Sequence, residues 1–262
     1  MRKDELIRLL SGKDEIAASL AMKEMLSRQD LTEVIAEYED TENPFLRKRI
    51  QQLSSIFNRI CLDSSLEETI DDVSRTPWDV FSQINVVIDR QTSLVQLHEL
   101  LGEYISYGGR FRLRSTEQFV DYMKRLQLCA EPYSERFVTE YLVSDVLFNR
   151  IGNPLVVAVI AHQIARIHGY VINIGTINDK ICLRDNSFNV IIPADDWIVF
   201  HPSASDFHPL DKRALAIQLL AGIFAASILE QLHEITYTAS ALLGRLAQYP
   251  GVPPAPLGTT HC

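Results

Sequence analysis

The first sixty residues repeat apolar positions at intervals of three and four, which is the period of an α-helix. Leu6, Leu9 and Leu10 form one short apolar stripe, and the sequence SGKD at 11–14 interrupts it. A proline suits the first position of a helix, where its missing N–H is not needed. The pattern therefore predicts four short helices, which begin near residue 4, at Asp14, after Asp30 and near Pro44.

Between residues 63 and 150 the apolar spacing again indicates helices. The acidic segment DSSLEETIDDVSR offers Ser64 or Ser65 as the cap of a new helix. The Gly-Gly pair in SYGGRFRLRS predicts a turn, followed by a small strand or an extended loop. The helices are predicted at 78–88, 91–106, 116–128 and 134–149.

The segment 153–168 has the clearest boundaries of any predicted helix. Asn153 is a good N-cap, Pro154 suits the first helical position, and Gly169 suits the left-handed residue that follows the last turn. The residues at 155–161 are wholly apolar, so this helix must be buried on nearly all sides. Its β-branched residues favour a strand by propensity, but the caps and the length decide for a helix.

Four β-rich runs, YVINI, KICLR, FNVII and WIVF, lie between residues 170 and 200 and are separated by polar turns. Their spacing of roughly ten residues predicts an antiparallel meander. Two helices are expected after it, from about Asp211 to Leu232 and from about Ile235 to Leu246. The last fourteen residues contain four prolines and predict a disordered tail at 248–262.

The chain has a formal net charge of −9, which argues against a general affinity for nucleic acid or anionic membranes. The local basic cluster of Arg110, Arg112 and Arg114 is interpreted as a solvated strand face. The expected partner is therefore neither a nucleic acid nor a lipid surface.

Four cysteines lie far apart and form no CxxC pair, so neither a disulfide framework nor a zinc knuckle is expected. The N-terminus is charged and lacks the apolar core of a signal peptide. The longest apolar runs, around 154–161 and 214–229, are too short or too interrupted to span a bilayer. These features predict a cytoplasmic protein without membrane insertion.

A buried helix followed by an antiparallel meander is the arrangement in which papain-like and transglutaminase-like folds hold their chemistry. The segment FVTEYLVSDVLFNRIGNPLVVAVIAHQIARIHGYVINIG resembles the core of the SirB-type transglutaminase-like proteins. The resemblance covers about residues 64–230, and the helices ahead of it are similar to the HEAT-like helices of bacterial members. It implies an α+β fold, mostly helical, with a papain-like core. The matching residues are Arg150, Gly152, Asn153, Pro154, Ile164, Ala165, Gly169, Leu183 and Arg184.

In active members of that family a cysteine stands at the start of the helix, and a histidine and an acid follow on the next strands. A helix N-terminus lowers the pKa of a thiol, and a neighbouring histidine pairs with the thiolate. The corresponding positions here hold Pro154, Lys180 and His201. Proline has no nucleophilic atom, so the resemblance implies a degenerate triad, and no residue is assigned as catalytic.

Two other residues are fallback candidates for chemistry, Cys182 and His162. Cys182 falls at a strand position that should face the core, where inert packing is the favoured interpretation. His162 lies on the central helix and is interpreted as a core or helix-face histidine. His168, near the end of that helix, is interpreted as a capping residue.

A metal site is not expected. His201 and His208 flank Asp206, but this spacing matches no recognised set of ligands. The chain also contains no GxGxxG, P-loop or HExxH motif, so no cofactor is predicted.

The sequence leaves three functional hypotheses. The favoured one is a catalytically inactive transglutaminase-like module that binds another protein or peptide. The alternative is a cysteine-dependent hydrolase or acyltransferase in which Cys182 acts with His201 or His162 as the base. A purely structural role in an assembly is the third. The predicted organisation is a HEAT-like region at 1–62, a transglutaminase-like core with C-terminal helices at 63–247, and a tail at 248–262.

Overall fold

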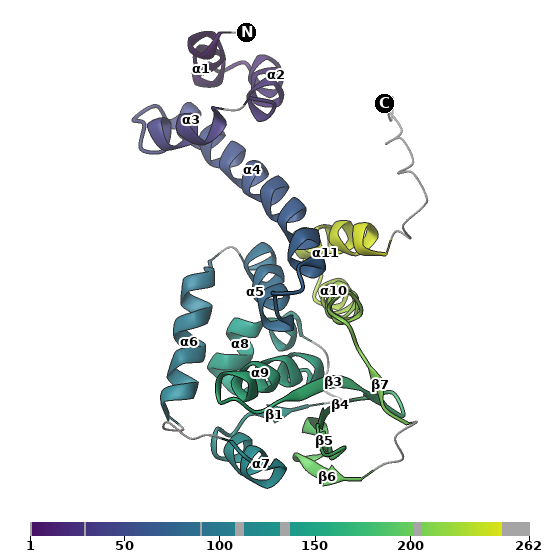
Figure 1. The fold of residues 1–262 in the computed structure, drawn as a ribbon. Coiled ribbons are helices and arrows are strands. Elements are labelled where there is room, and N and C mark those ends of the chain that lie inside the picture. Colours follow the sequence, from purple (N-terminus) through teal and green to yellow (C-terminus); the bar gives the residue numbers. More distant parts are fainter. Residues whose placement is uncertain are drawn as a thin grey trace. The chain divides into compact units, whose positions relative to one another are not determined.

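The computed structural model shows a mostly helical chain with a small antiparallel sheet, which is an α+β fold (Figure 1). It describes residues 2–28, 30–89, 91–107, 113–131, 137–201 and 206–247, without the side chains of Ser55, residues 58–64 and Tyr107. The chain divides into two compact units, Met1–Ser65 and Leu66–Cys262. The predicted tail at 248–262 lies outside the described residues.

The first unit contains four helices, as the sequence predicts. They are α1 (Lys3–Ser11), α2 (Glu15–Leu26), α3 (Leu31–Tyr38) and α4 (Pro44–Asp71), and α4 continues past the boundary into the second unit. Their apolar faces meet in one core, whose buried members are Leu6, Leu10, Ala21, Met25, Leu31, Val34, Leu46, Ile50 and Leu53.

Two polar side chains fix how α1 ends and α2 begins. Asp14 caps α2, because its carboxylate accepts hydrogen bonds from the backbone N–H groups of the first turn. Arg49 of α4 is only 3% exposed and donates to the carbonyl oxygens of Leu10 (2.6 Å) and Gly12 (2.5 Å). A buried arginine thus satisfies carbonyl groups that the end of α1 leaves without helical partners.

The prediction that a new helix begins at Ser64 or Ser65 is wrong, because α4 runs without interruption to Asp71. The segment 61–71 holds neither glycine nor proline, so nothing in it breaks a helix. Leu66 and Ile70, one turn apart, are both buried and give this last part of α4 an apolar face.

The second unit begins with three helices, α5 (Pro77–Ile88), α6 (Leu94–Tyr107) and α7 (Thr116–Arg125), which correspond to three of the predicted ones. The fourth predicted helix, at 134–149, is confirmed only in its last part, and residues 134–136 lie outside the described residues. A short 3-10 helix, η1 (Val138–Tyr141), and α8 (Val143–Asn149) replace it, separated by the extended residue Leu142. This break lets Tyr141 pack on α10, where a Cβ on Gly222 would lie 2.2 Å from the tyrosine ring.

The predicted meander is confirmed. Strands β3 (Ile172–Ile177), β4 (Lys180–Asp185), β5 (Val190–Ile192) and β6 (Ile198–Phe200) pair antiparallel with their neighbours in sequence. The sequence missed β7 (His208–Pro209), which pairs with β3 and gives the order β6-β5-β4-β3-β7.

A second, two-stranded parallel sheet was also missed. It joins β1 (Cys129–Ala130) to β2 (Ile151–Gly152), and β2 stands just before the central helix. Strands of two residues are too short to leave a pattern in the sequence, so only the fold brings them together.

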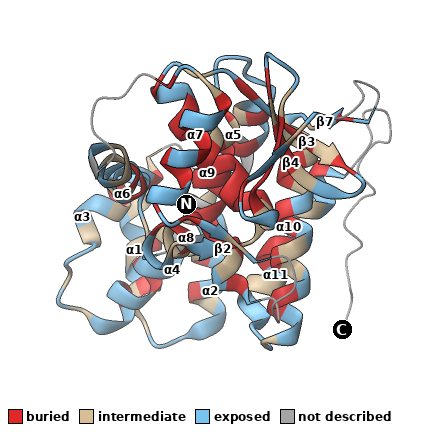
Figure 2. Ribbon diagram, turned by 90° about the horizontal axis from the view of Figure 1, so that it is seen from below, coloured by how far each residue is buried: buried red, intermediate tan, exposed pale blue. Residues whose placement is uncertain are grey.

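The central helix α9 (Pro154–Ile167) has the predicted boundaries. The side chain of Asn153 accepts a hydrogen bond from the backbone N–H of Leu155 at 2.9 Å, and Gly169 adopts a φ of 75°. All residues at 155–161 are buried, and α9 appears red at the centre of the unit in Figure 2. It packs against β3, β4 and α5, which agrees with the predicted burial on nearly all sides.

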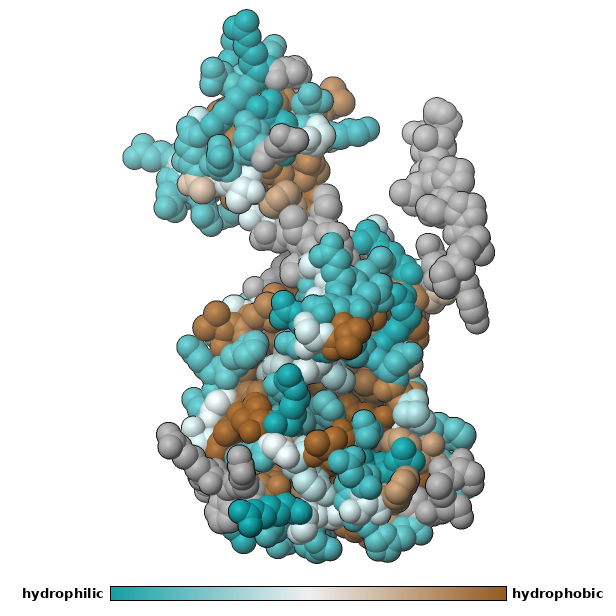
Figure 3. Space-filling model, viewed as in Figure 1, coloured by the Kyte–Doolittle hydropathy of each residue, from teal (hydrophilic) through white to brown (hydrophobic). Residues whose placement is uncertain are grey.

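The chain continues into two helices, α10 (Lys212–Leu229) and α11 (His233–Leu246), which pack on each other. Among the described residues α10 is long and apolar enough to cross a membrane, which corrects the expectation that this run is too short. Of that 18-residue stretch, 39% is buried inside the protein. Hydrophobic residues also reach the surface of the second unit in several places (Figure 3).

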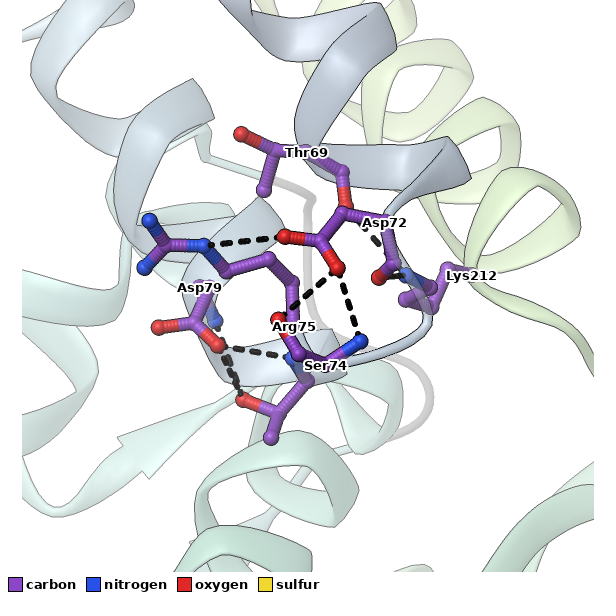
Figure 4. A network of polar contacts seen from close by, with 7 residues as sticks. Thr69, Asp72, Ser74, Arg75, Asp79 and Lys212 are labelled. Carbon is purple, nitrogen blue, oxygen red and sulfur yellow. Dashed lines mark hydrogen bonds and ion pairs between the residues drawn. The ribbon is translucent and has the colours of Figure 1, made fainter.

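Polar contacts fix the end of α4 against the start of α10 (Figure 4). Lys212 donates from Nζ to the carbonyl oxygens of Thr69 (3.2 Å) and Asp72 (2.5 Å). Thr76 and Asp79 form a capping box that begins α5 a few residues later. The lysine satisfies carbonyl groups that the end of a helix leaves open.

Candidate functional site

The candidate site lies where α9 begins. After α9 the chain reverses at Gly169 and returns along the helix as β3, which packs on it together with β4. The fourteen residues of α9 and the six of β3 have nearly the same length, about 20 Å. The turn between β3 and β4 therefore lies toward the start of α9.

Pro154 occupies the first position of α9 and supplies no reactive atom. The N–H group of Leu155 next to it is already bound by the capping side chain of Asn153. The chemistry of this helix start is therefore that of a well-capped helix, without a group able to attack a substrate.

Lys180 begins β4 directly after the turn that lies toward the start of α9, and it is paired with Asp195. The lysine Nζ lies 2.8 Å from a carboxylate oxygen, and the two side chains are 49% and 39% exposed. Asp195 ends the 3-10 helix η2 (Pro193–Asp195), which directly follows β5, and its carboxylate accepts the hydrogen bond from the lysine. A charged, paired lysine takes no proton from a neighbour.

The structure does not bring His201 to this place. Arg184 in β4 is level with Val190 of β5, which in turn is level with Phe200 of β6. Phe200 therefore lies about 13 Å beyond the level of Lys180, and His201, which follows it, lies further still toward the end of β4. The physical reason is that β6 reverses the direction of β5, so the end of β5, with Asp195, is the segment that returns to Lys180.

Cys182 lies in the middle of β4 and is fully buried. Its thiol donates a weak hydrogen bond to the carbonyl oxygen of Gly175, and burial raises its pKa to about 12. A thiol with this pKa is protonated at neutral pH and does not act as a nucleophile. The predicted core position of Cys182 is confirmed.

His162 and His168 lie on one helix in different surroundings. Burial, together with the charge of Arg166, lowers the pKa of His162 to about 4, so this ring is neutral at pH 7. Its Nδ1 atom has no hydrogen-bond partner in the described part of the chain. His168 follows the last residue of α9, and its Nε2 lies 3.2 Å from the hydroxyl of Tyr122.

Within the described residues no group of three or more histidine, cysteine or acidic side chains is placed to hold a metal ion. His208 is an exposed residue of β7, and residues 202–205 between it and His201 are not described. Of the predicted basic cluster, Arg110 and Arg112 also lie outside the described residues, and Arg114 is exposed.

The densest polar contact of this unit was not predicted. Asp185, at the end of β4, is 6% exposed and accepts hydrogen bonds from three side chains. Burial alone raises the pKa of this carboxyl, but the hydrogen bonds outweigh burial and hold the pKa below its ordinary value. The donors are Thr116, Tyr170 and Asn189, at distances of 2.5 to 2.9 Å.

Of the three side chains that donate to Asp185, only that of Asn189 is near it in sequence, so no local motif reveals the network. Asp185 also accepts the backbone N–H groups of Ser187 and Asn189, both at 2.8 Å, and closes the turn between β4 and β5. The short DNS segment was a visible turn signal, but not a sign of burial.

The comparisons with known proteins give no match: no family model, no curated protein and no solved structure corresponds to this chain.

Proposed function

We propose that this chain is a catalytically inactive transglutaminase-like protein that acts by binding another protein. One observation carries the proposal. The helix start that would hold a nucleophile bears Pro154, and the strand end beside it bears the ion pair of Lys180 with Asp195. Neither a nucleophile nor a free base is therefore available at that point.

The arrangement of α9, β3 and β4 supports the finer part of the proposal, a transglutaminase-like core. A capped, buried helix packs on an antiparallel meander that begins directly after it. The helix pair α1 and α2, followed by α3 and α4, supports HEAT-like hairpins ahead of the core. Such hairpins present elongated surfaces that suit protein recognition.

Exposed aliphatic side chains support a binding role. On α2, Ile16 and Leu20 are 77% and 65% exposed and lie one turn apart on the same face. On α10, Leu229 is 73% exposed. Large apolar side chains that gather on a surface are typical of places where a partner binds.

The alternative of an enzyme with a displaced site is supported less well. It needs the thiol of Cys182 as a nucleophile beside an imidazole, but that thiol is buried, protonated and bonded to Gly175. The partner is proposed to be a protein or peptide, not a nucleic acid or a membrane interior, in the cytoplasm. The described thiols Cys129 and Cys182 are free, which suits a reducing compartment.

The test is affinity capture with the tagged full-length chain, followed by titration of the purified partner. Removing residues 1–62 would cut through α4, so surface variants are preferable to truncation. Expected results are a complex of defined stoichiometry and no amide hydrolysis or acyl transfer by the isolated chain. The double variant Ile16→Asp/Leu20→Asp then reports whether the first unit takes part, and Val73→Asp, at a residue 96% exposed, is its matched control.

Turnover that survives purification and disappears in a Cys182→Ala variant would refute the proposal in favour of the displaced enzyme. Failure to obtain any complex of fixed stoichiometry would refute it as well.

A further inference from the structure

The outer edge of β6 is an open strand edge in the described part of the fold. β6 is the last strand of the five-stranded sheet and has a neighbour, β5, on one side only. Among the described residues, its backbone makes no hydrogen bond outside the pairing with β5. Alternate residues of β6 therefore direct N–H and C=O groups away from the sheet, where another strand can pair with them.

The side chains of β6 are apolar on both faces of the sheet. Ile198 is 54% exposed and Val199 is 36% exposed, although Val199 shares a row with the fully buried Leu183 and Ile191. The side chains of this row are thus buried on β4 and β5 but partly exposed on β6. A further strand beside β6 would bury Val199 as well. Protected strand edges usually carry charged residues, which discourage pairing with another strand. The segment from Trp197 to Phe200 contains none.

We propose that this edge binds an extended, apolar segment of another protein by strand addition, which specifies the binding mode within the proposed function and rests on it. The segment contributes a row of backbone hydrogen bonds and aliphatic side chains that cover Ile198 and Val199. Asp196, just before β6, pairs with Lys124 at 3.0 Å, and because its side chain is 87% exposed its second carboxylate oxygen can also accept a basic residue at that end of the segment.

A second copy of this chain fits the edge less well. β6 has three residues, so pairing it with itself buries far less than the 1,200 Å² or so that a stable dimer needs. A single extended segment has no such requirement, because its own backbone and side chains supply the whole contact and a moderate affinity suffices.

The test is a titration of the full-length chain with a fluorescent peptide of sequence Lys-Thr-Val-Ile-Val-Thr-Lys, followed by fluorescence anisotropy. Saturable binding is expected, and hydrogen exchange at the amide of Val199, which points away from β5, should slow in the complex. A peptide N-methylated at alternate positions, which loses the donors along one edge, should bind about tenfold more weakly. Replacing both lysines by glutamate should weaken binding about threefold.

On the protein, Ile198→Lys should weaken binding about tenfold or more, because the charge enters an apolar strand contact. Val171→Lys is the matched control, since Val171 is 57% exposed and lies outside the strands. If Ile198→Lys does not fold, the N-methylated peptide tests the same contact on the unchanged protein.

Equal affinity for the N-methylated peptide, or no change with Ile198→Lys in the folded protein, would overturn the proposal. A self-association that Ile198→Lys abolishes would overturn it in favour of a second copy. If a captured partner binds the Ile198→Lys variant as tightly as the unchanged protein, strand addition is refuted, but the proposed function is not. Failure of the proposed function is a separate result, the absence of any stoichiometric partner.

Discussion

The two ends of the sheet that packs on α9 carry contrasting polar contacts. At the start of β4, Lys180 and Asp195 form an ion pair with both side chains well exposed. At the end of the same strand, Asp185 is 6% exposed and surrounded by donors from two other elements and its own turn. One strand therefore begins in a solvated contact and ends in a desolvated network.

The difference indicates where polar side chains do the most for this protein. A buried, fully hydrogen-bonded carboxylate stabilises the fold, whereas an exposed ion pair contributes little. An enzyme with this arrangement would need its organised, desolvated groups at the start of α9, beside Pro154. Here they stand at the opposite end, where they tie α7 and β4 together, and this supports a binding role over catalysis.

Both ends of the sheet are held in place by packing on the buried helix α9. The variant with the largest expected effect tests this burial. Ile160→Asp should unfold the second unit, because an unpaired buried charge costs several kcal/mol against a total stability of about 5–15 kcal/mol. Circular dichroism and thermal melting measure it. Ile167→Asp is the control on the same helix, at a residue 48% exposed, and should keep nearly the same melting temperature.

The second effect concerns the thiols. Cys182 is buried with a pKa raised to about 12, whereas Cys129 is exposed. Alkylation of the native protein should therefore be at least about a hundredfold slower at Cys182 than at Cys129, as read by peptide mass spectrometry. In urea the two rates should converge. Fast alkylation of Cys182 in the native protein would instead support the alternative of an enzyme with a displaced active site.

Next in size is the loss of the Asp185 network. Asp185→Asn keeps the shape but replaces one acceptor oxygen by an NH2 donor that faces other donors, so some of them lose their hydrogen bonds, and the free energy of unfolding should fall by about 1–3 kcal/mol. Urea denaturation at pH 7 measures the change. Asp196→Asn, at a side chain 87% exposed, is the control and should change it by less than about 0.5 kcal/mol. Equal losses of stability in the two variants would mean that the buried carboxylate stabilises the fold no more than the exposed one.

The same carboxyl predicts a pH dependence. Its pKa is lowered in the folded state, so its stabilising effect is complete above the unfolded pKa of about 4 and is lost as pH falls through the folded pKa. The stability difference between the native chain and Asp185→Asn should therefore be constant from pH 7 to 5 and shrink below pH 4. A difference that grows toward low pH would mean that the folded pKa is raised.

Local signals in the sequence predicted much of the fold but not the contacts between distant segments. Asn153, Pro154 and Gly169 mark the ends of α9 by chemistry that acts within a few residues, and the structure agrees. The Asp185 network joins residues up to 73 positions apart, so no local pattern could reveal it.

The candidate site shows the same limit. The start of α9 was predicted from its cap, but His201 was assigned to it from the family resemblance, without the register of the strands. The pairing of β5 with β6 places that residue at the far end of the sheet and brings Asp195 to Lys180 instead. Register depends on turn geometry and burial across strands, which the pattern of one strand does not contain.

The smallest expected effect is at the exposed end of the comparison. In a double-mutant cycle of Lys180→Ala and Asp195→Ala, the coupling energy should be below about 1 kcal/mol and should fall further in 1 M salt, because the pair is solvated. The exposed pair Lys3–Glu37, at 2.6 Å, is the matched control and should behave alike. A coupling above about 2 kcal/mol that salt does not reduce would instead mean a desolvated, organised contact at the start of α9. Both ends of the sheet would then hold a desolvated polar contact. The solvated state of the Lys180–Asp195 pair would no longer support the proposal that the start of α9 is catalytically inactive.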